Sequence, residues 1–360
     1  MLKRNFGIAC LLAVMASGGA VAADYKGPLE VPAKVNTQFA QANRLTAVAK
    51  AGNALVAAGP RGHILVSENG GQSWSQVPVP VSSDLVAIRF LNATHGWAVG
   101  HDGIVLHSAD AGKTWIKQFD GKQAAAVADA HFKRAMAAGD EQAKAFESFV
   151  TRFVEEGADK PFLDVLFLNE KEGFVIGAFN TAFRTRDGGK TWEPLFWRVE
   201  NPNSYHLYAL ATHAGELYAA GERGLLLRWN REQERFVALA SPYQGSFFGL
   251  LDTGKELIAY GLRGNVYATS DGAATWRKIE TPAADSAVGA TNLADGRYAL
   301  VTVGGRILLN KKDGSGFDLL PARSPMPYAS VAAAGGQAVV AVGARGIRVE
   351  TINGQTVQEK

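Results

Sequence analysis

The chain has 360 residues, a single cysteine and a formal charge of +3 at pH 7. Lys3 and Arg4 fall in an N-terminal leader, so the rest of the chain keeps 35 basic against 34 acidic residues. This balance, without a run of Lys or Arg, argues against a nucleic-acid or general polyanion binder. Cys10 also lies in the leader, so the mature chain has no cysteine for a disulfide or a thiolate metal site.

The first residues predict export. The apolar run Ile8–Ala16 follows a basic start and is too short to span a membrane. Ala20-Val21-Ala22 fits a signal-peptidase site, with cleavage after Ala22 or Ala23 left open. A lipoprotein reading of Cys10 is disfavoured because Gly7 stands where a Leu is expected. We therefore expect residues 1–23 to be a secretory signal peptide and the mature protein to be periplasmic.

A repeated pattern fills the mature chain. Two markers recur, a turn that ends in Trp and a hairpin glycine. The Trp-ending turns, called Asp turns here, are Ser67–Trp74, Ser108–Trp115, Thr185–Trp192 and Thr269–Trp276. The hairpin glycines are Gly62, Gly103, Gly224, Gly264, Gly305 and Gly346, with Asn180 in the third copy. A period of about 40 residues is typical of a propeller or solenoid.

Each copy reads as four short strands separated by turn residues, which is typical of a propeller blade. The first strands are expected to begin near Leu45, Leu85, Leu163, Leu207, Phe247, Val288 and Tyr328. We predict an all-β, seven-bladed propeller of antiparallel blades over residues 24–360. The fourth and sixth copies have lost the Asp turn, at Arg228–Phe236 and Asn310–Phe317.

The outer strand of the seventh blade has two candidate segments. It could come from Thr351–Gln358 or from Leu29–Val35. The N-terminal segment is preferred, because it would lock the ring and cover an open sheet edge.

The spacing breaks over residues 121–160, between the second and third copies. Ala124–Ala138 is Ala-rich, Gly139 ends it, and Asp140 is a suitable N-cap for a second apolar helix. We predict a helical hairpin inserted between blades 2 and 3. It either packs on the rim of the propeller or docks a partner.

Little in the sequence predicts catalysis or metal binding. The Asp turns are interpreted as structural, because Asp bonds nearby backbone groups and each turn offers too few carboxylates for calcium. The histidines are scattered without metal-ligand spacing, and no phosphate loop or nucleophile motif is present. We expect no cofactor, no metal and no catalytic residue.

The turn between the second and third strands carries the more useful signal. Arg61, Arg223, Arg263 and Arg345 share one position in four copies. Equivalent turns of a propeller lie on one face, so these arginines are expected to gather there. They are either ordinary solvated turn residues or an anion-binding patch for carboxylates of a partner. The same face is expected to carry His101, Asp102, Arg306 and the connector aromatics Trp197, Tyr205 and Tyr243.

Two segments, Phe90–Trp115 and Phe167–Trp192, resemble the plant and cyanobacterial Ycf48/Hcf136 family of photosystem II assembly factors. The shared features are Gly96-Trp97 or Gly173-Phe174, the closing Gly100 or Gly177, and the Asp turn. The likeness extends over all seven copies, from about Asn36 to Thr351.

The resemblance implies a lumenal or periplasmic seven-bladed propeller that is not an enzyme. It implies binding to an assembling membrane protein through an arginine-bearing face, with the four turn arginines as candidates. The long insert and the eroded fourth and sixth copies depart from the family pattern.

Two hypotheses follow. The favoured one is an exported, monomeric, non-enzymatic scaffold that binds a membrane protein or its exported segment. The alternative is a sialidase-like hydrolase or glycan-binding propeller. That alternative needs a Tyr and two carboxylates converging on the arginines, and the N-terminal Arg-Ile-Pro signature of sialidases is missing.

Overall fold

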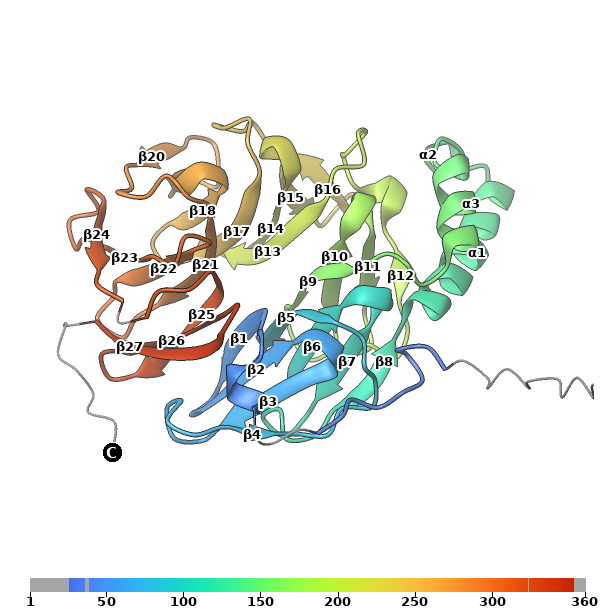
Figure 1. Cartoon of the computed structure of the whole chain (residues 1–360). Coiled ribbons are helices and arrows are strands. Elements are labelled where there is room, and N and C mark those ends of the chain that lie inside the picture. The colour runs from blue at the N-terminus through green and yellow to red at the C-terminus, as the bar shows by residue number, and fades with distance from the viewer. Residues whose placement is uncertain (1–25, 36–38, 323, 353–360) are drawn as a thin grey trace, which may run out of the picture.

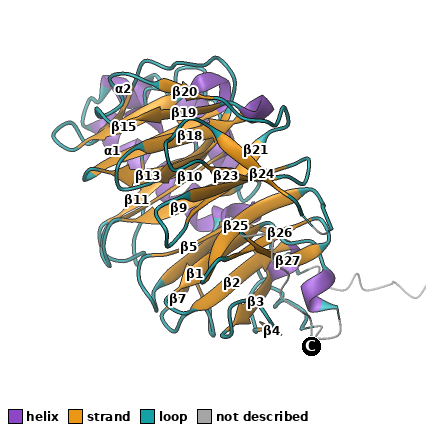
Figure 2. Ribbon diagram, turned by 90° about the vertical axis from the view of Figure 1, so that its left-hand side faces the viewer, coloured by secondary structure: helices purple, strands orange, loops and turns teal. Residues whose placement is uncertain are grey.

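The computed structural model describes residues 26–35, 39–322 and 324–352. Residues 1–23, assigned above to the signal peptide, lie outside this range. Seven antiparallel sheets surround a central axis and pack face to face (Figures 1 and 2). Six sheets have four strands and the last has three among the described residues. The chain is therefore a seven-bladed β-propeller, with blades numbered here in chain order.

The innermost strand of each blade lines the axis and begins within two residues of the predicted position. These strands are β1 (Ala47–Ala51), β5 (Leu85–Phe90), β9 (Phe162–Phe167), β13 (Leu207–His213), β17 (Phe247–Asp252), β21 (Ala287–Asn292) and β25 (Tyr328–Gly335). Each contacts the innermost strands of the two neighbouring blades, and β1 contacts β25, so the ring is closed.

The second strands are the most deeply buried, because neighbouring sheets cover both of their faces. They are β2 (Ala54–Gly59), β6 (Gly96–Gly100), β10 (Gly173–Gly177), β14 (Glu216–Gly221), β18 (Leu257–Gly261), β22 (Tyr298–Thr302) and β26 (Ala338–Gly343). The third strands are β3 (His63–Ser67), β7 (Val105–Ser108), β11 (Ala182–Thr185), β15 (Leu226–Asn230), β19 (Val266–Thr269), β23 (Ile307–Asn310) and β27 (Gly346–Thr351). The outer strands are β4 (Ser75–Gln76), β8 (Ile116–Phe119), β12 (Glu193–Pro194), β16 (Arg235–Ala238), β20 (Arg277–Ile279) and β24 (Phe317–Leu320).

The Asp turns join third and outer strands and are closed by their own hydrogen bonds. In blade 2, Asp110 Oδ1 accepts from the Thr114 N–H at 2.9 Å, and Ser108 Oγ accepts from the Gly112 N–H at 2.9 Å. The Trp115 indole N–H donates to the Gly112 carbonyl at 2.9 Å, and the ring is 5% exposed. The polar groups of the motif thus form hydrogen bonds within the turn itself, which is a structural role.

Among the described residues, blades 1 and 7 meet by side-chain packing and a backbone hydrogen bond. Leu45 and Val48 of blade 1 share a hydrophobic cluster with Val340 and Val342 of blade 7. The Leu45 N–H donates to the Gly343 carbonyl at 3.1 Å.

Neither candidate segment supplies a fourth strand to blade 7 among the described residues. Leu29–Val35 lies along the outer part of blade 1, where the Ala33 N–H donates to the Val79 carbonyl at 3.0 Å. The preferred N-terminal closure is therefore wrong. The alternative segment, Thr351–Gln358, falls largely outside the described residues.

Three helices follow β8 and precede β9, namely α1 (Gly121–Ala137), α2 (Glu141–Lys144) and α3 (Glu147–Glu156). The Asp120 side chain caps α1, and the Asp140 side chain caps α2. The helices lie on the outer side of blade 3 (Figure 1). None of the helices in the described part of the chain has the length and apolarity needed to cross a bilayer.

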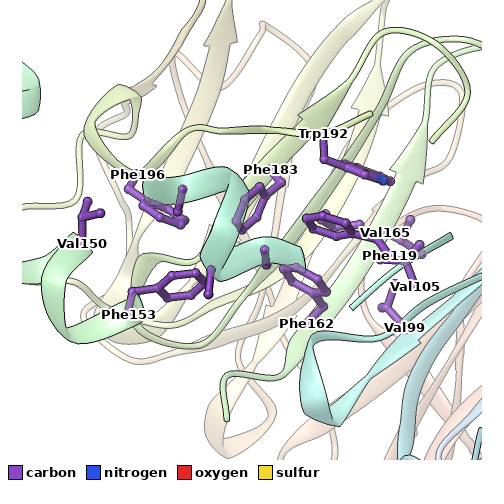
Figure 3. Packing of buried hydrophobic residues seen from close by; sticks show 14 of the residues in the cluster. Val99, Val105, Phe119, Val150, Phe153, Phe162, Val165, Phe183, Trp192 and Phe196 are labelled. Carbon is purple, nitrogen blue, oxygen red and sulfur yellow. The ribbon is translucent and has the colours of Figure 1, made fainter. Parts of the chain in front are cut away.

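The helices share one core with blades 2 and 3. Phe153 of α3 packs on Phe196 with ring centroids 5.0 Å apart and on Phe183 of β11 at 6.2 Å (Figure 3). Phe183 and Phe196 are fully buried. The insert is therefore part of the fold of blade 3 and not a loose appendage.

Candidate functional site

In blades 1 to 5, the turn between the second and third strands has one conformation. Each is a three-residue 3-10 turn: η2 (Pro60–Gly62), η3 (His101–Gly103), η4 (Ala178–Asn180), η6 (Glu222–Gly224) and η7 (Leu262–Gly264). The middle residue has a positive φ in every case: Arg61 59°, Asp102 59°, Phe179 52°, Arg223 52° and Arg263 57°. A non-glycine residue in this region is uncommon and is maintained only where its surroundings hold it.

These turns are held by the connector that enters the following blade. The backbone N–H of Arg61 donates to Asp84 Oδ1 at 2.8 Å, and that of Arg263 donates to Ser286 Oγ at 3.3 Å. The Gly62 N–H donates to the Ser83 carbonyl at 2.8 Å. The turns and the connectors therefore lie on one face of the propeller. The backbone fixes each turn, so the guanidinium groups are not needed to hold it.

The four turn arginines are exposed, and no carboxylate among the described residues forms a salt bridge with any of them. The Arg223 guanidinium lies 5.9 Å from the centre of the Tyr205 ring. Arg345 Nη2 donates to the Pro325 carbonyl at 2.7 Å. Arg306 differs, because it forms an ion pair with Asp285. Its charge is neutralised within the fold, so it does not belong with the other four.

The order of the blades divides the arginines into two pairs. Arg345 and Arg61 lie in the adjacent blades 7 and 1, and Arg223 and Arg263 lie in the adjacent blades 4 and 5. Blades 2 and 3 separate the pairs on one side and blade 6 on the other. The sequence predicted that the four arginines gather on one face, and the order of the blades divides them into two basic sectors of that face. Arg345 also lies in a shorter turn, between β26 and β27, without the positive φ of the others.

The remaining predicted residues are placed as follows. His101 is exposed and Asp102 is half-buried in the turn of blade 2, against which the first residue of α1 packs. Trp197 is 6% exposed and packs on Phe132 of the insert, so its assignment to the surface is wrong. Tyr205 and Tyr243 are half-buried on the connectors. The Tyr243 hydroxyl donates to the Leu262 carbonyl at 3.2 Å.

A central cavity of about 950 Å³ runs between the innermost strands. One residue near the start of each innermost strand lines it on the turn-bearing side. From blade 1 to blade 7 these residues are Thr46, Val86, Leu163, Tyr208, Phe248, Val288 and Ala329. In blades 2 to 7 the strand pairing skips this residue, and such a bulge re-aims the side chain. These seven lining residues were not predicted from the sequence. Each of them directly follows a buried residue at or just before the start of the innermost strand.

An ion pair inside the cavity holds three blades together. Arg89 donates to both carboxylate oxygens of Asp164, at 2.7 and 2.6 Å. Asp164 also accepts the backbone N–H groups of Val165 and Leu210, at 2.9 and 2.8 Å. The Asp164 carboxylate thus accepts four hydrogen bonds, and the pair ties blades 2, 3 and 4. Burial raises the pKa of the nearby Tyr260 hydroxyl above its ordinary value.

Comparison with known proteins identifies the family. A family profile described as "Photosynthesis system II assembly factor YCF48" matches residues 66–144 and 143–316. The chain belongs to the YCF48 family. The stability/assembly factor HCF136 of Oryza sativa is 25% identical over 270 residues, covering 68% of this chain and 56% of that protein. The Ycf48 lipoprotein of Synechococcus sp. CC9902 is 26% identical over 147 residues, covering 39% and 43%.

This YCF48-family chain therefore spans about half the length of the curated relatives it matches. A solved structure of YCF48 bound to D1 peptide has a TM-score of 0.61, with 16% identity, over 92% of this chain and 98% of that one. At this identity the likeness shows the fold alone. No group of three or more His, Cys, Asp or Glu residues suited to a metal ion is found in the described ranges.

Proposed function

We propose that this protein is a non-catalytic, exported scaffold that binds a segment of a membrane protein and assists its assembly or stability. Two findings support the proposal. The chain belongs to a family described as photosystem II assembly factors, and one solved relative of the same fold holds a D1 peptide. The observation that carries it is the turn face, where four arginines are exposed without a carboxylate partner among the described residues.

Exposed arginines on rigid turns suit the recognition of carboxylates. The guanidinium group donates two parallel hydrogen bonds to a carboxylate, and it is less strongly hydrated than an ammonium group. The charges act locally, because the chain outside the leader is nearly neutral. We therefore assign Arg61, Arg223, Arg263 and Arg345 as partner-binding residues, with His101, Tyr205 and Tyr243 beside them. The expected partner is an acidic segment exposed on the periplasmic or lumenal side of a membrane.

The helices between blades 2 and 3 have a supporting role in this proposal. Their apolar faces cover Phe183 and Phe196, and α1 begins beside the turn of blade 2. The insert thus fixes the turn face where blades 2 and 3 meet. A monomer is sufficient for such a function.

The test uses the tagged mature protein to capture partners from detergent-solubilised membranes of its own organism. We expect a membrane protein to be recovered, and to be lost when the four arginines are replaced by Ala. A matched variant removes four exposed lysines, Lys171, Lys190, Lys255 and Lys312, from loops at the opposite end of the blades. It should retain the partner, and binding should weaken with salt, since exposed charges are screened over roughly 8–10 Å. Equal recovery with both variants would contradict the proposal.

The same protein tests the sialidase-like alternative. Incubation with a fluorogenic sialoside should give no turnover. Turnover that disappears in Arg263→Ala would instead establish a hydrolase and overturn the scaffold proposal.

A further inference from the structure

We propose that the partner segment docks on one sector of the turn face, blades 3 to 5, and presents apolar or aromatic side chains at alternate positions beside a carboxylate. The inference rests on the proposed function and specifies its partner. The sector is defined by an aromatic strip of four residues: Phe179, His206, Tyr208 and Phe248. The basic pair Arg223 and Arg263 borders it.

Phe179 is the residue that singles out blade 3. It occupies the turn position held by Arg61, Arg223 and Arg263 in three other blades, with a φ of 52°. Its ring is 52% exposed. A half-exposed aromatic ring in a strained turn contributes little to the core, and strain of this kind concentrates at binding sites.

The surroundings hold Phe179 firmly in place. Its backbone N–H donates to His206 Nδ1 at 2.9 Å. The Asn180 N–H donates to the Tyr205 carbonyl at 3.3 Å, and the Asn180 side chain donates to the Phe196 carbonyl at 2.9 Å. The ring is therefore displayed by a rigid backbone, so little conformational entropy is lost when a partner binds.

The aromatic strip continues from Phe179 into the cavity. The Phe179 and His206 ring centroids are 4.5 Å apart, those of His206 and Tyr208 6.0 Å, and those of Tyr208 and Phe248 5.5 Å. Tyr208 and Phe248 are the bulged cavity-lining residues of blades 4 and 5. The equivalent residues of the other five blades are the smaller Thr46, Val86, Leu163, Val288 and Ala329. The cavity mouth is thus aromatic on one side only.

Positive charge borders the strip on the same side. Arg223 lies over the Tyr205 ring, and Arg263 follows Leu262, whose carbonyl is bound by Tyr243. Lys160 Nζ lies 5.9 Å from the centre of the Phe179 ring and pairs with Glu156 and Asp159. The other basic pair, in blades 7 and 1, borders Ala329 and Thr46 at the mouth. Within the described ranges, Arg223 and Arg263 are the turn arginines whose blades also supply the aromatic cavity-lining residues Tyr208 and Phe248.

These features define the occupant. An extended peptide places side chains of one side about 6.4–6.8 Å apart, so two such side chains fit along a strip of four rings whose successive centroids are 4.5, 6.0 and 5.5 Å apart. Apolar or aromatic side chains at positions i and i+2 would therefore lie along the strip, and a neighbouring Asp or Glu would reach Arg223 or Arg263.

The experiment selects peptides from a displayed random dodecapeptide library on the immobilised mature protein. We expect enriched peptides to carry two apolar or aromatic residues at alternate positions close to an acidic one. The affinity of one enriched peptide should fall about tenfold or more in Phe179→Arg and in the double variant Tyr208→Ala, Phe248→Ala, since a tenfold change corresponds to about 1.4 kcal/mol. Phe179→Arg places in blade 3 the residue that blades 1, 4 and 5 already tolerate. The controls are Val288→Ala at the equivalent position of blade 6 and Lys171→Ala at the opposite end of the blades, both of which should bind within about twofold of the parent. The double variant Arg61→Ala, Arg345→Ala is measured beside them to locate the partner on the turn face.

The outcomes separate this inference from the proposed function. Acidic peptides without an apolar pattern, bound equally well by Phe179→Arg, would overturn the strip and leave the arginine face intact. Loss of binding in Arg61→Ala, Arg345→Ala alone would place the partner on blades 7 and 1 and would also overturn the inference. A library that yields no enriched peptide would count against both.

Discussion

Trp115 provides a quantitative test of the blade architecture. The side chain is 5% exposed, packs edge-on against Phe90 and donates its indole N–H to the Gly112 carbonyl at 2.9 Å. A buried Trp covers roughly 150–250 Å², which at about 25 cal/mol/Å² gives an upper bound of about 4–6 kcal/mol. Truncations of this kind cost about 3–5 kcal/mol, and the lost hydrogen bond adds about 1 kcal/mol. Trp115→Ala should therefore destabilise the protein by about 4–6 kcal/mol.

The matched control is Trp276, which ends the Asp turn of blade 5. It is only half-buried, and its indole N–H has no hydrogen-bond partner in the described structure. Trp276→Ala should cost about half as much, roughly 2 kcal/mol. Urea unfolding followed by far-UV circular dichroism measures both, because the other tryptophans would confuse a fluorescence signal. Equal shifts of the two midpoints, or no shift for Trp115→Ala, would refute the reasoning.

Two further predictions concern the insert and the Asp turns. Replacing residues 123–156 by a short Gly/Ser bridge uncovers Phe183 and Phe196, so the thermal midpoint should fall and dye binding to exposed apolar surface should rise; an unchanged midpoint would show that the insert is dispensable. Hydrogen bonds from the Thr275 hydroxyl and backbone hold the pKa of Asp271 to about 2, below its ordinary value of 3.8. Because the folded pKa is the lower one, this carboxylate stabilises the protein above about pH 4, and its contribution is lost as the pH falls toward 2. Asn69 occupies the equivalent position in blade 1, so Asp271→Asn is compatible with the turn. In urea titrations, the free energy of unfolding of Asp271→Asn should fall less than that of the parent between pH 7 and pH 3. Equal falls in the two proteins would contradict this.

The repeat made the architecture predictable because the chemistry of its turns is local. The eight residues Ser108–Trp115 contain the donors and acceptors that close the turn, so reading them was enough to place a third and an outer strand. The closure of the ring was not predictable in this way. Leu29–Val35 has the composition of a strand, yet it lies along blade 1, where tertiary hydrogen bonds decide its place.

The candidate site was only partly accessible from the sequence. The shared position in the repeat predicted that the four arginines lie on one face. Their division into two pairs follows from the order of the blades around the ring. Trp197 was expected on that face because it lies in a connector, and the insert that covers it comes from a distant part of the chain. Phe179 was not predicted because the equivalent position is charged in blades 1, 2, 4 and 5, and the sequence alone does not show that its ring is exposed. Tyr208 and Phe248 follow Leu207 and Phe247 directly. A comparison of this position across the seven copies would have predicted the two aromatic side chains at the mouth of the cavity.

The closure between blades 1 and 7 has a consequence for how such a chain could be rebuilt. Every sheet in the described range comes from one continuous stretch of chain, so no blade borrows a strand from the far end. Cutting a connector such as the one between β16 and β17 would therefore separate two complete blades, and the new ends would lie in loops on the surface. Circular permutation should be tolerated at each such boundary once the old termini are bridged. By the same logic, duplication or loss of a gene segment encoding one repeat would change the circumference of the ring by a whole blade, without leaving an orphaned strand.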